Sequence, residues 1–452
     1  MKFSNFLLLM WRYGASFVLI GYLIFQFPGV SEAQVAGADS LLEEVTLPEA
    51  IEYAIKRHPE IRQAQLDEKI TTARIRSRLA DWYPQVNFNY NFQHNLVLPA
   101  SVIGGNTVRF GTNNNSAAQF TANQNIFDRD VLLARRTSQD VQSLASQTTS
   151  SNKIDLAVNV SKAFYDVLLT LQQIKVAESN ITRIERSLKD AYNQYSVGIV
   201  DKIDYKRATI ALNNTQASKK SNEDLLVAKV EWLKTLMNYP EKGTLRIAFD
   251  SLQMENEILL DTLQQPDYRS RIEYRQLQTQ RSLLVSNLEY NKWAYLPTVS
   301  AFGAYNLNFL NDNLGELYRR IYPNFFLGVN LGVPIYQGGK RKTNISIAEM
   351  ELQRNELEIS NFQIGVRANH ADALALYKRN LTSYQTLREN MKLAEEVYDV
   401  IQLQYRSGVK TYLEVITSET DLRTAQINYY NAVYQLLASK IDVQKALGQI
   451  NY

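Results

Sequence analysis

Four segments of the chain alternate apolar and polar residues with a period of two. They cover residues 85–93, 118–126, 299–309 and 325–333. This period is that of a β-strand with one apolar face. Asparagine is frequent on the polar side, and strands of roughly ten residues with this composition are typical of transmembrane β-barrels. The residues expected to face the barrel lumen are Asn87, Asn89, Asn306 and Asn308.

Aromatic residues precede the strands, where a barrel carries its interfacial girdle. They are Trp82, Tyr83, Trp293 and Tyr295. A soluble, half-buried sheet would show the same alternation, but these aromatics and the export signal described below favour a barrel. The connecting segments 99–116 and 310–323 are rich in Asn, Gly and Asp and are expected at the cell surface.

Two very long segments have the pattern of helices. Residues 128–194 contain neither Pro nor Gly, and residues 340–406 are interrupted only by Gly365. Each would span roughly 100 Å as one helix. Large residues recur every seven positions, with mostly small residues three positions later, which predicts left-handed coiling with close packing. In the first segment the large positions are Val160, Val167, Ile174, Ile181, Leu188 and Tyr195.

The chain repeats itself after about 210 residues, a separation typical of an internal duplication. The clearest pair is 195–204 against 405–414, in which a Tyr stands three residues before a Gly and a carboxylate six after it. Each long helix is expected to turn at this Gly and return. The predicted divisions are a first repeat at 34–238, a linker or belt at 239–265, and a second repeat at 266–452.

Residues 1–33 have the features of a secretory signal peptide. Lys2 and Arg12 supply positive charge, 17–27 is apolar, and 31–33 fits a small-x-small cleavage site. A membrane anchor is the alternative. The sequence has no Cys, and no later segment offers about 18 consecutive apolar residues. An exported chain with amphipathic strands points to the periplasm or outer membrane of a double-membraned bacterium.

Composition excludes several functions. The net charge is +3, with 49 basic and 46 acidic residues mixed along the chain, which does not favour nucleic acid. The run 338–340 lacks the other residues of a phosphate-binding loop. His58, His94 and His370 have no metal-ligand spacing. No catalytic arrangement stands out, so we expect neither enzyme activity, a metal nor a cofactor.

Four strands cannot close a barrel, since about eight are needed. Lipid does not tolerate open sheet edges. The chain is therefore expected to oligomerise, and geometry alone permits a dimer, a trimer or a tetramer.

In this combination of features the chain resembles the TolC-type outer-membrane efflux family, whose members are also called outer membrane factors. The resemblance rests on the duplicated pattern of strands and hairpin, on the run 334–341 that joins the last strand to a long helix, and on the two tip turns. It implies an α+β membrane protein: a homotrimer with a twelve-stranded barrel, four strands per chain, continued by a periplasmic α-helical barrel with a belt. It also implies a periplasmic adaptor and an inner-membrane transporter as partners.

The resemblance also implies roles at the tips. Val197, Gly198 and Ile199 match the motif that docks an adaptor, and Ser407, Gly408 and Val409 are a looser copy. The tunnel constriction would contain Asp204, Tyr405, Lys410 and Glu414. In the family, the Tyr and a basic residue bond to the acidic residue of the first repeat. The basic residue here is Lys, which lacks the bidentate fork of Arg, so we expect easier opening.

The same pattern allows other interpretations of Asp204 and Glu414. Both lie near a helix start, where negative charge is favourable in any protein. For the whole chain, the predicted function is a passive exit duct of a tripartite efflux pump in the outer membrane. A type I protein secretion duct and a structural envelope coiled coil are the alternatives, and the sequence does not indicate the substrate.

Overall fold

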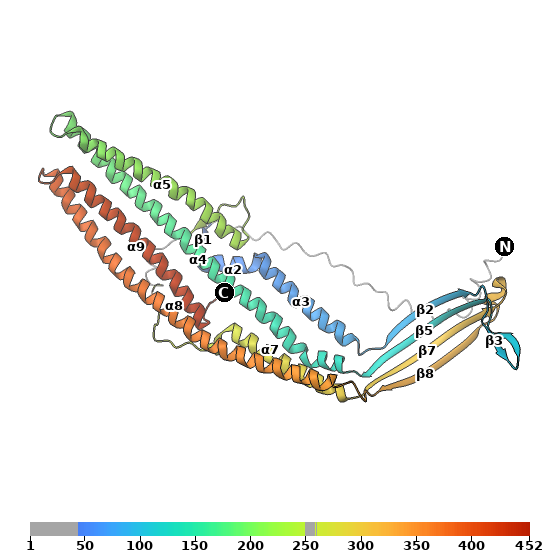
Figure 1. Ribbon diagram of the computed structural model, residues 1–452. Coiled ribbons are helices and arrows are strands. Elements are labelled where there is room, and N and C mark those ends of the chain that lie inside the picture. Colours follow the sequence, from blue (N-terminus) through green and yellow to red (C-terminus); the bar gives the residue numbers. More distant parts are fainter. Residues whose placement is uncertain (1–43, 249–257, 259) are drawn as a thin grey trace. The chain divides into compact units, whose positions relative to one another are not determined.

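The computed structural model describes residues 44–248, 258 and 260–452 (Figure 1). The predicted signal peptide, 1–33, and part of the predicted belt, 239–265, lie outside the described residues. In the described part, each repeat contributes two strands of one sheet and a pair of long helices.

The main sheet has four antiparallel strands in the order β2-β5-β7-β8. Their bounds are Gln85–His94, Asn114–Phe127, Thr298–Asn311 and Tyr322–Gly332. All four predicted strands are confirmed, although β5, β7 and β8 are longer than predicted. Phe127 rather than Ile126 pairs with Val299, so a bulge ends β5 just before the helix begins.

The register separates the two faces of this sheet. Residues directly opposite each other on neighbouring strands lie on the same face. One such row is polar and runs through Asn89, Gln119, Asn306 and Asn324. The adjoining row is aromatic and consists of Phe88, Phe120, Tyr305 and Phe325. The sheet is therefore amphipathic across all four strands.

The connecting segments are partly ordered. Within 99–116, strands β3 (Ala100–Ile103) and β4 (Asn106–Arg109) form a hairpin that projects beyond the sheet in Figure 1. Gly104 and Gly105 form its two-residue turn at φ values of +60° and +86°, which favour glycine. Between β7 and β8, the 3₁₀ helix η3 covers Leu314–Arg319.

Two helical hairpins follow the strands, as predicted. α4 (Arg129–Ser196) returns as α5 (Lys202–Met237), and α8 (Lys340–Arg406) returns as α9 (Tyr412–Leu447). Asp128 caps α4, because its side chain accepts hydrogen bonds from the N–H groups of Asp130 and Val131. Besides pairing within each hairpin, α9 packs along α4, so the two hairpins share a seam.

The heptad positions explain this packing. The small positions of α4 are buried, and they are Ala163, Thr170, Ala177, Ile184 and Ala191. On α9 the large positions are buried, and they are Val415, Leu422, Tyr429, Leu436 and Val443. The large positions of α4 nearer its tip, such as Ile181 and Leu188, are only half-buried.

Three helices and a small sheet were not predicted. α3 (Pro59–Ala80) precedes β2, and α7 (Ile272–Lys292) precedes β7. β1 (Glu44–Val45) pairs in parallel with β6 (Arg246–Ile247), and α2 (Leu47–Arg57) follows β1. The predicted linker therefore pairs, through β6, with the start of the described chain.

Candidate functional site

The two tip turns have the same backbone geometry. Gly198 and Gly408 have φ values of +79° and +74°, a region that L side chains rarely adopt. The N–H groups of Gly198 and Ile199 donate to the carbonyls of Tyr195 and Gln194, at 3.0 and 2.9 Å. In the same way, the N–H groups of Gly408 and Val409 donate to the carbonyls of Tyr405 and Gln404. Each helix thus ends in a Schellman motif, which fixes the path of the chain at the tip.

The side chains beside the two glycines point into solvent. Val197 is 69% exposed, and Ile199 and Val409 are each 72% exposed. Ser407 is exposed as well, and its hydroxyl donates to the carbonyl of Leu403. The first tip therefore exposes two apolar side chains on an ordered turn, and the second tip exposes one.

Tyr405 lies where the two tips meet. Its side chain is 9% exposed and packs with Ala191 of α4, Ala208 of α5 and Tyr412 of α9. Its hydroxyl donates to the Oε1 atom of Gln194 at 3.1 Å. Burial and the nearby Asp204 raise the pKa of this hydroxyl, so it remains a donor.

Lys410 and Glu414 form a pair at the start of α9. The Lys410 Nζ atom donates to the Glu414 Oε1 atom at 2.6 Å. The other carboxylate oxygen accepts from the N–H and hydroxyl of Thr411, which completes a capping box. These bonds, first that of Lys410, lower the pKa of Glu414 to about 2. Glu414 is therefore a helix cap as well as a constriction candidate.

Asp204 occupies the matching position of α5 but has different surroundings. The cap residue is Asp201, whose side chain makes no capping hydrogen bond. Within the described residues, the Asp204 carboxylate makes no hydrogen bond or ion pair. Burial raises its pKa, Arg207 opposes this shift, and Asp201 adds to it.

The predicted bonds to Asp204 are thus not formed within this chain. Tyr405 bonds to Gln194 instead, and Lys410 bonds to Glu414. The physical reason is proximity, since Glu414 follows Lys410 by four residues in the same turn into α9, whereas Asp204 belongs to the other hairpin. A bond between Lys410 and Asp204 of different chains stays a prediction. Sequence reasoning missed Gln194, although it precedes the Tyr-x-x-Gly pattern directly.

The four lumen candidates lie on the polar face of the sheet. Asn87 pairs with Thr121, Asn89 and Asn306 both pair with Gln119, and Asn308 pairs with Ala117. The same register places Gln119 and Thr121 of the segment 118–126 on the asparagine side of the sheet. The lumen position of the four asparagines stays a prediction.

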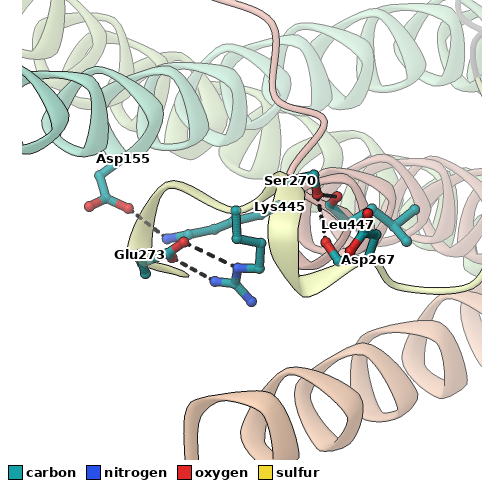
Figure 2. Close-up of polar contacts among 7 residues, drawn as sticks. Asp155, Asp267, Ser270, Glu273, Lys445 and Leu447 are labelled. Carbon is teal, nitrogen blue, oxygen red and sulfur yellow. Dashed lines mark hydrogen bonds and ion pairs between the residues drawn. The ribbon is translucent and has the colours of Figure 1, made fainter. Parts of the chain in front are cut away.

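A polar junction that the sequence did not indicate joins the end of α9 to α4 and to the segment that precedes α7. Figure 2 shows Lys445 of α9 reaching Asp155 of α4, at 2.7 Å. Arg271 forms two hydrogen bonds to Glu273 of α7, the shorter at 2.6 Å. The Ser270 hydroxyl donates to the carbonyls of Asp267 and Leu447, at 2.7 and 3.0 Å. This junction fixes the end of α9.

The described residues contain no group of three or more His, Asp or Glu side chains arranged to hold a metal ion. His94 instead hydrogen-bonds through Nδ1 to Asn114 at 2.6 Å. Among the helices of the described part, none is both long and apolar enough to cross a membrane.

Comparison with known proteins agrees with this arrangement. The sequence profile of the outer membrane efflux protein family matches residues 50–238 and 274–449, which is most of the chain. The outer membrane protein TolC of Escherichia coli (strain K12) is 19% identical over 436 residues, covering 92% of this chain and 85% of TolC. The proteases secretion protein PrtF of Dickeya chrysanthemi is 19% identical over 422 residues, covering 90% of this chain and 88% of PrtF.

A solved structure shows the same fold. The MtrE outer membrane channel of Neisseria gonorrhoeae, in its open state, superposes with a TM-score of 0.69 at 18% identity. The superposition covers 89% of this chain and 88% of that channel. Together with the duplicated hairpins and the amphipathic sheet, the family match shows that this chain belongs to the outer membrane efflux protein family and serves as a transport duct of the outer membrane.

Proposed function

We propose that three copies of this chain form a twelve-stranded barrel that continues into a helical tunnel. The observation that carries the proposal is the sheet with one polar face and two open edges. Within the described residues, β2 and β8 each pair on one side only. A sheet in lipid needs both edges paired, and neighbouring copies supply β8 beside β2. The aromatic row then faces lipid, and the asparagines line the lumen.

The tips are proposed to dock a periplasmic adaptor. Val197 and Ile199 on one turn, and Val409 on the other, are exposed apolar side chains held on Schellman turns. Because the backbone is already ordered, a partner loses little conformational entropy in fixing it. An inner-membrane transporter would supply energy and substrate through that adaptor.

The constriction is proposed to close between chains. Lys410 and Asp204 carry opposite charges near the tips, and Asp204 has no ion pair within the described chain. A neighbouring Lys410 could leave Glu414 for this carboxylate, since exposed pairs of this kind exchange at a cost of only about 1 kcal/mol. Such a contact would narrow the tunnel until an adaptor separates the tips.

The substrate class stays open between small molecules and proteins. The name of PrtF refers to secretion of proteases, whereas other relatives include the cation efflux system protein CusC of Escherichia coli O157:H7. Type I protein secretion is therefore the second candidate function. The transporter, rather than the wall of the duct, would decide between them.

Photo-crosslinking in cells tests the docking role. A photoreactive residue replaces Ile199, and a matched control carries it at the exposed Lys220, away from the tip on α5. Capture of a periplasmic adaptor at position 199 but not at 220 supports the duct, and the transporter bound to that adaptor indicates the substrate class. Capture of other copies of this chain alone, at normal expression, favours the envelope coiled coil.

A further inference from the structure

A cavity of about 280 Å³ lies in the seam between the two hairpins. α4 contributes Asn180, α5 contributes Arg207 and Thr215, and α9 contributes Glu419 and Arg423. The cavity is roomy enough for several water molecules, each of which occupies about 30 Å³ in the liquid. It lies just above the tip cluster around Tyr405, because Ile416 borders both.

Three buried polar atoms near this seam have no hydrogen-bond partner among the described residues. Glu419 is only 6% exposed, and its Oε1 atom has no hydrogen-bond partner among the described residues. The Nδ2 atom of Asn180 and the Nε atom of Arg183 are likewise buried without partners in the described part of the chain. The Arg183 guanidinium bonds instead to the side-chain oxygen of Asn180. Unsatisfied buried groups are rare in proteins, and each calls for an explanation such as an ordered water molecule or a functional role.

The charged and titratable side chains near Glu419 come from all four long helices. Arg183 of α4 and Arg423 of α9 attract its carboxylate but form no ion pair with it among the described residues. Arg423 bonds to Thr215, and the Arg183 guanidinium stacks 5.6 Å from the Tyr398 ring of α8. Arg207 of α5 lines the cavity. Burial, and then the charge of Glu419, raise the pKa of the Tyr412 hydroxyl on α9.

We propose that Glu419 is a proton-controlled joint between the two hairpins. Protonated Glu419 fits the seam as a neutral side chain. When it is ionised, the carboxylate draws water into the adjoining cavity and loosens α9 from α4 and α5. The physical basis is that an ionised group buried without a partner is costly, whereas hydration or separation removes the cost.

The sign of the pH dependence follows from burial, which raises the pKa of Glu419 to about 7, while Arg183 and Arg423 oppose the shift. A hydrated joint would restore an ordinary pKa near 4.5. The closed seam is therefore favoured fully below about pH 4.5 and loses this preference as pH rises to about 7. The largest change in the closed-to-loosened ratio is roughly a few hundredfold.

The consequence for conduction rests on the proposed duct function, but the joint itself can be measured without transport. Because the chain has no cysteine, Asn214→Cys and Thr420→Cys place two spin labels on opposite sides of the cavity, on α5 and α9. Labelled chains are assembled with excess unlabelled protein, and the distance between the labels is measured by pulsed electron paramagnetic resonance from pH 5 to pH 8.

The labels should be close at pH 5 and separated, or more broadly distributed, at pH 8. Glu419→Gln should abolish this transition and keep the labels close at both pH values. If that variant does not assemble, Glu419→Thr serves the same purpose, because it also removes the charge. The matched control Asp421→Asn removes an exposed carboxylate of the same helix and should leave the transition unchanged.

Two results would overturn the joint. One is a constant distance from pH 5 to pH 8 in the chain with Glu419. The other is a transition that survives Glu419→Gln but disappears in Asp204→Asn, which would assign it to the tip carboxylate. A pH-dependent distance in protein that conducts no ions in planar bilayers would support the role of Glu419 and refute the proposed duct function.

Discussion

Gly448→Ala should destabilise the junction at the end of α9 by about 2–3 kcal/mol. Gly448 has a φ of +72°, which costs a residue with a Cβ atom about 1–2 kcal/mol. The added Cβ would also lie 2.8 Å from the Ser270 Oγ atom. Moving that hydroxyl breaks its bond to the Leu447 carbonyl, worth about 1 kcal/mol.

Thermal unfolding of the purified protein in detergent measures this effect. Gly365→Ala is the matched control, since Gly365 lies inside α8 with nothing within 4 Å of an added Cβ. That change should leave the melting temperature equal or slightly higher, because Ala favours a helix by about 1 kcal/mol. Equal melting temperatures for Gly448→Ala and the unmodified chain would refute the reasoning. Gly448→Asn should cost less, since the matching cap of α5 is Asn238, at a φ of +51°.

Three further predictions concern the tips. Replacing Asp204 and Lys410 together with Ala should raise single-channel conductance in planar bilayers if they close the constriction between chains, and an unchanged conductance would count against that closure. Gly198→Asp should abolish capture of the adaptor while trimers persist on native gels, because the turn needs a positive φ; normal efflux in this variant would exclude the docking role. Glu414→Gln should speed amide exchange in the first turn of α9. Since the pKa of Glu414 is lowered to about 2, its cap should persist above pH 4.5 and weaken only as pH falls toward 2, which exchange at several pH values would test.

Local pattern predicted the elements that carry the fold. Residues 128–194 and 340–406 became α4 and α8 almost to the residue, because a long segment without breakers has no alternative to a helix. The strands followed from alternation, and the turns followed from Gly198 and Gly408. The helices α3 and α7 were not predicted because their apolar residues form no clear stripe, even though Pro59 begins α3.

Contacts between distant segments could not be predicted in the same way. The partner of Lys410 depends on which carboxylate lies within reach, and the capping box around Thr411 had already placed Glu414 there. β1 pairs with β6 across about 200 residues, and two-residue strands carry no pattern of their own. Glu419 looks like any helical glutamate in the sequence.

The sequence by itself determined the duplicated strands, the coiled hairpins and their turns, because periodicity and glycine act over a few residues. Only the tertiary structure decided that α9 lies along α4 and that Tyr405 bonds to Gln194. It also decided that Glu419 is buried beside a cavity. Burial and hydrogen-bond partners depend on which helix faces come together, and that choice is made by the packing of the whole chain.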